Sequence, residues 1–218
     1  MRVRDALKLL GFKRLFKNLI FGVALLLICS VRSQAETSVP KPQLEAARDA
    51  YFKSIQGDAK QARSATNQFA ELGREHPGDP LVEAYLGSLD LLEAGRSWQV
   101  WNQRELTQKG LAALDKAVKE APDNLEVRFI RAATTWHLPF FFHRKEQAVE
   151  DFRLIAPKVE EAAREGRLPS PIAAAALNYY GQILVQGKNP TEAQEAFRAA
   201  VRVAPQSPAG REAATRIQ

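Results

Sequence analysis

The side chains best suited to chemistry in this sequence are three histidines, and they form no recognisable site. His76 precedes Pro77 at an expected helix end, where a cation can satisfy the last carbonyl oxygens, so we interpret it as a capping residue. His137 and His143 flank an expected turn and have no aspartate, glutamate or cysteine at metal-ligand spacing. We therefore expect no metal site and no cofactor.

Motifs of the common catalytic classes are also missing from the sequence. It contains no Gly-rich phosphate loop, no Gly-x-Ser-x-Gly elbow and no His-Glu-x-x-His helix. Acidic pairs such as Glu160-Glu161 alternate with lysine and arginine, which is typical of a solvated helix face. The single cysteine, Cys29, lies near the N-terminus, so the rest of the chain has no thiol nucleophile and no disulfide. We therefore predict no catalytic residue and no enzymatic activity.

Two aromatic-rich segments, at 96–101 and 136–143, are the most unusual feature of the chain. Such rings either fill gaps between imperfectly matched helices or form an exposed patch that anchors a partner. Each segment falls at the turn inside an expected helix pair, and the two pairs are neighbours, so both should emerge at one edge of the fold. The aromatic residues concerned are Trp98, Trp101, Trp136, Phe140, Phe141 and Phe142.

The basic charge of the chain is concentrated at its N-terminus. The net charge is +6, but residues 1–35 hold seven basic residues and one acidic residue, which leaves 24 of each in the remainder. A neutral body cannot supply the positive field that drives binding to phosphate backbones. We therefore predict that the protein does not bind nucleic acid.

The N-terminal segment has the features of a secretory signal peptide. A basic stretch up to Lys17 precedes an apolar run over 19–31, which is short for a membrane span of about 20 residues. Ser33-Gln34-Ala35 offers small residues for cleavage, which predicts a signal peptide at 1–35 and export to the periplasm or beyond. The alternative is an uncleaved N-terminal membrane anchor, the one case in which we expect membrane association.

The rest of the sequence indicates an all-α fold. Proline and glycine interrupt segments of helical periodicity that are rich in Ala, Leu, Glu, Arg and Gln, and nothing indicates a strand. Ser or Asp before proline predicts helix starts at Asp79, Ser170 and Ser207. After a short linker at 36–41, a domain at 42–218 should contain helices near 42–55, 58–75, 81–94, 105–120, 125–138, 144–166 (bent at Pro157), 172–186, 191–203 and 208–217.

The last helix pair resembles a tetratricopeptide repeat. That family's pattern is Trp-x2-Leu-Gly-x2-Tyr, then Ala-x3-Phe, then Pro, within 34 residues. Small residues let the two helices approach closely, and large ones fill the seam between them. Earlier pairs match less well; Arg131, for example, stands in a leucine slot. The matching residues of the last pair are Leu177, Tyr180, Gly181, Leu184, Ala193, Phe197, Ala200 and Pro205.

The resemblance implies a solenoid of about four antiparallel helix pairs, plus a short C-terminal capping helix, that binds a protein or peptide partner. Its first helices would line a concave face, and counting from Ala132 places Phe129, Trp136 and His137 on that face. We therefore expect an exported protein–protein interaction module, an adaptor or assembly factor. The alternative is a carrier of a small apolar ligand in an aromatic-lined groove. A flat exposed patch would favour the first, and an enclosed pocket the second.

Overall fold

The computed structural model describes residues 37–217, so the predicted signal peptide lies outside the described residues. Within this range the chain forms nine α-helices and one short 3-10 helix, with no strand, which confirms the all-α prediction. The helices are α2 (Lys41–Ile55), α3 (Ala59–Glu75), α4 (Pro80–Arg96), α5 (Val100–Glu120), α6 (Leu125–Trp136), η2 (Phe140–Phe142), α7 (Lys145–Arg164), α8 (Ser170–Gln186), α9 (Pro190–Val203) and α10 (Pro208–Ala214).

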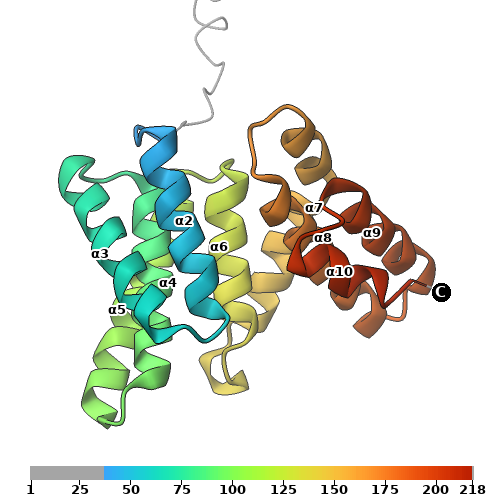
Figure 1. Cartoon of the computed structure of the whole chain (residues 1–218). Coiled ribbons are helices and arrows are strands. Elements are labelled where there is room, and N and C mark those ends of the chain that lie inside the picture. Colours follow the sequence, from blue (N-terminus) through green and yellow to red (C-terminus); the bar gives the residue numbers. More distant parts are fainter. Residues whose placement is uncertain (1–36, 218) are drawn as a thin grey trace, which may run out of the picture. The chain divides into compact units, whose positions relative to one another are not determined.

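The helices pack as consecutive pairs. Helices α2 and α3, α4 and α5, α6 and α7, and α8 and α9 each lie against one another, and α10 packs on both α8 and α9 (Figure 1). The first helices of successive pairs also touch, α4 with α6 and α6 with α8. Turns that join the two helices of a pair therefore lie at one edge of the described unit, and turns that join one pair to the next lie at the opposite edge.

Helix starts follow local capping chemistry at several points. The carboxylate of Asp79 accepts hydrogen bonds from the amides of Leu81 and Val82, as its position before Pro80 predicts. Ser207 accepts from the third residue of its helix in the same way. The predicted cap at Ser170 is wrong, because α8 begins one residue earlier and Ser170 is itself the first helical residue.

Two helix boundaries near the aromatic segments differ from expectation. Helix α5 begins at Val100 rather than near 105, so Trp101 is helical and the turn before it is short. Helix α6 ends at Trp136, two residues before the expected end, and the chain continues to α7 through η2. Pro157 lies inside α7, which continues past it.

Close contact between paired helices depends on glycine. A Cβ atom added to Gly181 on α8 would lie 2.5 Å from the ring of Phe197 on α9. In the α4–α5 pair, a Cβ on Gly87 would lie 2.8 Å from the carbonyl oxygen of Gly110. Around Gly181, the side chains of Leu177, Leu184, Ala193, Phe197 and Ala200 are buried, Tyr180 is half-buried, and Pro205 follows the end of α9.

The described part of the expected linker is packed onto the helices. The hydroxyl of Thr37 and the amide of Ser38 each donate to the Asp79 carboxylate at 2.9 Å, and Val39 is buried. His76 ends α3, but its Nδ1 atom lies 3.1 Å from the Ser38 hydroxyl instead of serving the helix carbonyls. The chain thus enters the folded unit at the turn between α3 and α4.

Candidate functional site

Large apolar side chains that stay exposed gather at one edge of the described unit. Eight such residues occur in the range 37–217, and all but Leu154 lie at or beside a turn between the two helices of a pair. We call the other seven the aromatic edge. They are Ile55, Trp98, Val100, Trp101, Phe140, Phe141 and Val185.

The four aromatic rings of this edge are mostly exposed to solvent. Phe140 is 88% exposed, Trp98 84%, Trp101 71% and Phe141 60%. They lie at the turns after α4 and α6, which both point to the lower side of Figure 1. These rings therefore do not fill gaps in the core, the first of the two interpretations considered above.

The phenylalanine run is held out by the local backbone. Helix η2 presents the three rings, and His143 ends it in a left-handed conformation with φ of 53°. Phe140 and Phe141 meet edge to face with centroids 5.9 Å apart, and Phe141 and Phe142 lie 4.7 Å apart. Phe142 is half-buried, so it joins the exposed tip to the rest of the loop.

Phe129 does not belong to a binding surface. It is only 3% exposed, and its ring meets that of Phe152 on α7 at 6.5 Å, so no partner can reach it. Trp136 is half-buried and packs against the hydrophobic core. The concave face predicted by counting from Ala132 is therefore incorrect at Phe129, because α7 covers that side of α6.

His137 is exposed at the end of α6 and is paired within the fold. Its Nε2 atom lies 2.9 Å from the hydroxyl oxygen of Tyr179 on α8. Partial desolvation lowers the pKa of His137, which favours the neutral imidazole. Burial raises the pKa of Tyr179 to about 12. The pair is a neutral hydrogen bond between α6 and α8 at neutral pH.

An ion pair links α2 to α6 across α4. The guanidinium of Arg48 donates to both carboxylate oxygens of Glu126, with Nε 2.6 Å from Oε1. The hydroxyl of the fully buried Tyr85 on α4 donates to the same Oε1 atom at 2.6 Å. Burial and the neighbouring carboxylate raise the pKa of Tyr85 well above its usual value, so it stays a donor.

A chain of hydroxyls runs through the same three helices. The hydroxyl oxygen of Tyr51 on α2 lies 2.7 Å from that of Ser88 on α4, which lies 2.8 Å from that of Thr134 on α6. These side chains form hydrogen bonds with one another. The facing surfaces of α2, α4 and α6 are therefore occupied by internal hydrogen bonds. The sequence carries no local signal for pairings this distant along the chain.

Arg131, which departs from the repeat pattern, has a structural role. It donates from Nε and Nη2 to the two oxygens of Asp151 on α7, at 2.8 and 2.9 Å. Arg128 donates to the same carboxylate at 2.6 Å. The carboxylate of Asp115 on α5 accepts hydrogen bonds from both Arg131 and Arg144. Because Asp151 is 1% exposed, this network ties α5, α6 and α7 together from within.

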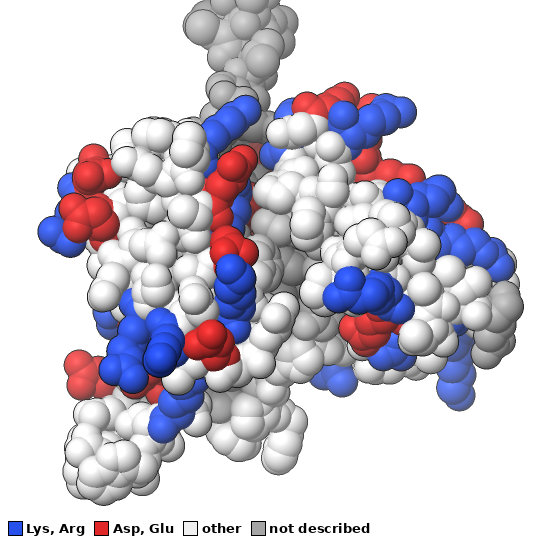
Figure 2. All heavy atoms as spheres, in the orientation of Figure 1, with Lys and Arg blue, Asp and Glu red and all other residues white. Residues whose placement is uncertain are grey.

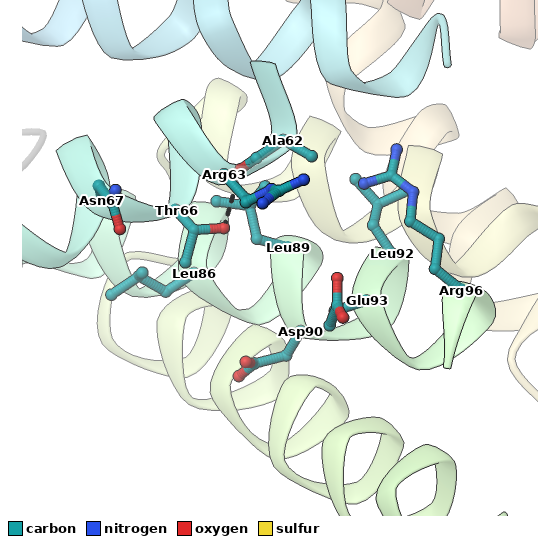
Figure 3. A pocket seen from close by; sticks show the side chains of 10 residues that line it. All are labelled: Ala62, Arg63, Thr66, Asn67, Leu86, Leu89, Asp90, Leu92, Glu93 and Arg96. Atoms are coloured by element: carbon teal, nitrogen blue, oxygen red, sulfur yellow. Dashed lines mark hydrogen bonds between the residues drawn. The ribbon is translucent and has the colours of Figure 1, made fainter. Parts of the chain in front are cut away.

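A shallow groove lies between α3 and α4, beside the aromatic edge (Figure 3). Its volume is about 260 Å³, with leucines from α4 along one wall and charged side chains from both helices around it. No aromatic residue of the aromatic edge lines the groove. Arg96, which does line it, lies two residues before Trp98 and so links the groove to the aromatic edge. The lining residues are Ala62, Arg63, Thr66, Asn67, Leu86, Leu89, Asp90, Leu92, Glu93 and Arg96.

No family model, curated protein or solved structure matches this chain. The candidate site therefore rests on geometry. Across residues 37–217, no three His, Cys, Asp or Glu side chains converge as metal ligands. In the same range no helix combines the length and the apolar character needed to cross a bilayer.

Proposed function

We propose that this protein is a non-catalytic interaction module, an adaptor or assembly factor of the cell envelope, and that the aromatic edge is its docking surface. The observation that carries the proposal is that seven of the eight exposed large apolar residues within 37–217 lie at one edge. Exposed tryptophan and phenylalanine are poorly hydrated, and aromatic side chains dominate binding energy where surfaces meet. The envelope location is inferred from the leader sequence.

We further infer that the helix pairs form a tetratricopeptide-like solenoid. Consecutive antiparallel pairs, the contacts between successive first helices and the Gly181–Phe197 contact support this assignment. Such folds serve as interaction scaffolds and carry no chemistry of their own. An adaptor needs a second surface, and the groove between α3 and α4 offers a protein segment an apolar wall with Arg63, Glu93 and Arg96 beside it.

A carrier of a small apolar ligand is the less favoured function. An apolar ligand needs an enclosed pocket in which most of its surface is buried. The aromatic rings instead project into solvent, with Phe140 and Trp98 more than four-fifths exposed. The groove between α3 and α4 is lined partly by charged side chains from both helices.

The test compares capture by wild type with capture by edge variants. Full-length chain with a C-terminal affinity tag is expressed with its leader, and the tagged protein is recovered from a detergent extract or intact envelope fragments. We expect material retained by wild type to be lost with the pairs Trp98→Ser/Trp101→Ser or Phe140→Ser/Phe141→Ser. Leu154→Ser removes an exposed apolar residue away from the edge and should change nothing. Equal retention by all four proteins would refute the proposal.

A further inference from the structure

We propose that the aromatic edge docks onto the surface of a lipid bilayer, with the turns after α4 and α6 inserted among the headgroups. This inference rests on the proposed function, because it takes the edge as the docking surface and names its occupant. It differs from the sequence-based expectation, in which membrane association required an uncleaved leader.

The exposed apolar surface consists of separate tips on different turns. Trp98, Val100 and Trp101 flank one turn, and Phe140 and Phe141 lie on another. Protein interfaces concentrate their anchors in the packed centre of a continuous patch. A bilayer interface has no fixed shape and accepts separate aromatic tips, because tryptophan and phenylalanine partition into the headgroup region. Tips carried by different turns of one edge fit the bilayer better.

Charged residues are distributed differently at the two edges of the described unit. The segments between helices at the aromatic edge carry Lys188, Asp58 and Arg144, which is paired with Asp115 on α5, whereas those at the opposite edge carry Asp79, Asp123 and Glu165 against Arg167. In Figure 2 the lower end of the α4–α5 pair is a lobe whose tip shows no charged side chain. Uncharged tips at an edge that lacks the acidic excess of the opposite edge suit insertion into a membrane that contains anionic lipid.

Protein-free vesicles test the proposal directly. Full-length chain, purified after expression with its leader, is mixed with phosphatidylcholine vesicles with and without phosphatidylglycerol and floated on a density gradient. We expect wild type to float with the vesicles, more strongly when the anionic lipid is present. Each double substitution, Trp98→Ser/Trp101→Ser and Phe140→Ser/Phe141→Ser, should weaken binding about tenfold or more, and Leu154→Ser should not.

Tryptophan fluorescence gives a second readout on the same samples. The chain has three tryptophans, Trp98, Trp101 and Trp136. Insertion should shift the emission to shorter wavelength and make it sensitive to quenching by lipids brominated near the headgroup. Both changes should disappear in Trp98→Ser/Trp101→Ser. Thermal unfolding followed by circular dichroism should stay unchanged in these variants, because the substituted rings are mostly exposed.

Three outcomes would overturn the proposal. Wild type that neither floats nor changes its emission shows that the edge does not bind lipid; if edge-dependent capture from detergent extract persists, the occupant is a protein and the proposed function stands. If wild type shows neither flotation nor edge-dependent capture, the proposed function is refuted as well. Flotation that survives both double substitutions would mean that lipid binds elsewhere on the protein.

Discussion

The ammonium nitrogen of Lys145 lies 4.7 Å from the centroid of the Trp136 ring. Trp136 ends α6 and Lys145 begins α7, so this contact closes the base of the loop that carries Phe140 and Phe141. The indole also packs against the hydrophobic core. Trp136 therefore supports the loop of the aromatic edge from below, and the exposed rings above it are the ones that we propose to dock.

Trp136→Ala should accordingly cost stability. Because the indole is half-buried, we expect the free energy of unfolding to fall by about 2–3 kcal/mol, less than the 3–5 kcal/mol of a fully buried aromatic. Urea denaturation measures the change. Trp98→Ala is the matched control and should stay within about 0.5 kcal/mol, since its ring is exposed. An unchanged urea midpoint for Trp136→Ala would show that the indole contributes little to folding and is free to bind a partner.

Gly181→Leu should destabilise the last helix pair by about 1–3 kcal/mol or more. A side chain at this position enters space held by the buried ring of Phe197, so α8 and α9 must move apart. Gly95→Ala on α4 is the control, because its added Cβ meets no atom within 4 Å. It should raise stability by about 0.5–1 kcal/mol through helix propensity. Thermal unfolding measures the stability of both variants. Equal changes for Gly181→Leu and Gly95→Ala would contradict the close packing of α8 against α9.

Asp151→Asn should cost about 3–5 kcal/mol of folding free energy. It removes the buried negative charge that receives Arg128 and Arg131 and leaves two guanidinium groups poorly compensated. Glu161→Gln removes the partner of Arg164 in an exposed pair and should change stability by about 0.5 kcal/mol or less. Guanidinium denaturation of the two variants shows whether the network contributes to folding stability. Similar denaturation midpoints would show that it does not.

Tyr179 should make stability depend on alkaline pH. Its pKa is raised to about 12, whereas a phenol in the unfolded chain ionises near pH 10. The stabilisation that comes from keeping the phenol protonated is therefore fully present below about pH 10 and is lost as pH rises toward 12. Tyr179→Phe abolishes this ionisation, so the stability advantage of wild type over the variant should shrink between about pH 10 and pH 12. A constant difference across that range, measured by urea denaturation, would show that Tyr179 does not titrate with folding.

Helix content was predictable from the sequence because its causes are local. Apolar periodicity, proline and glycine breaks, and the Asp79-Pro80 cap act over a few residues, and the expected helices lie close to those observed. The same local reasoning placed the two aromatic segments at turns inside neighbouring pairs. It failed at Ser170 and at the start of α5, where boundaries move by one to five residues without changing the hydrophobic pattern.

The tertiary structure decided which of these aromatic residues are free to bind. Phe129 and Phe140 were both predicted from the sequence to bind a partner, yet one is 3% exposed and the other 88%. The difference arises because Phe152 and α7 fold over Phe129, whereas nothing in the described unit covers η2. The pairing of Arg48 with Glu126, 78 residues apart, likewise has no local signal. Composition and periodicity determine that helices form and how they pair; burial and long-range partners depend on how the pairs stack.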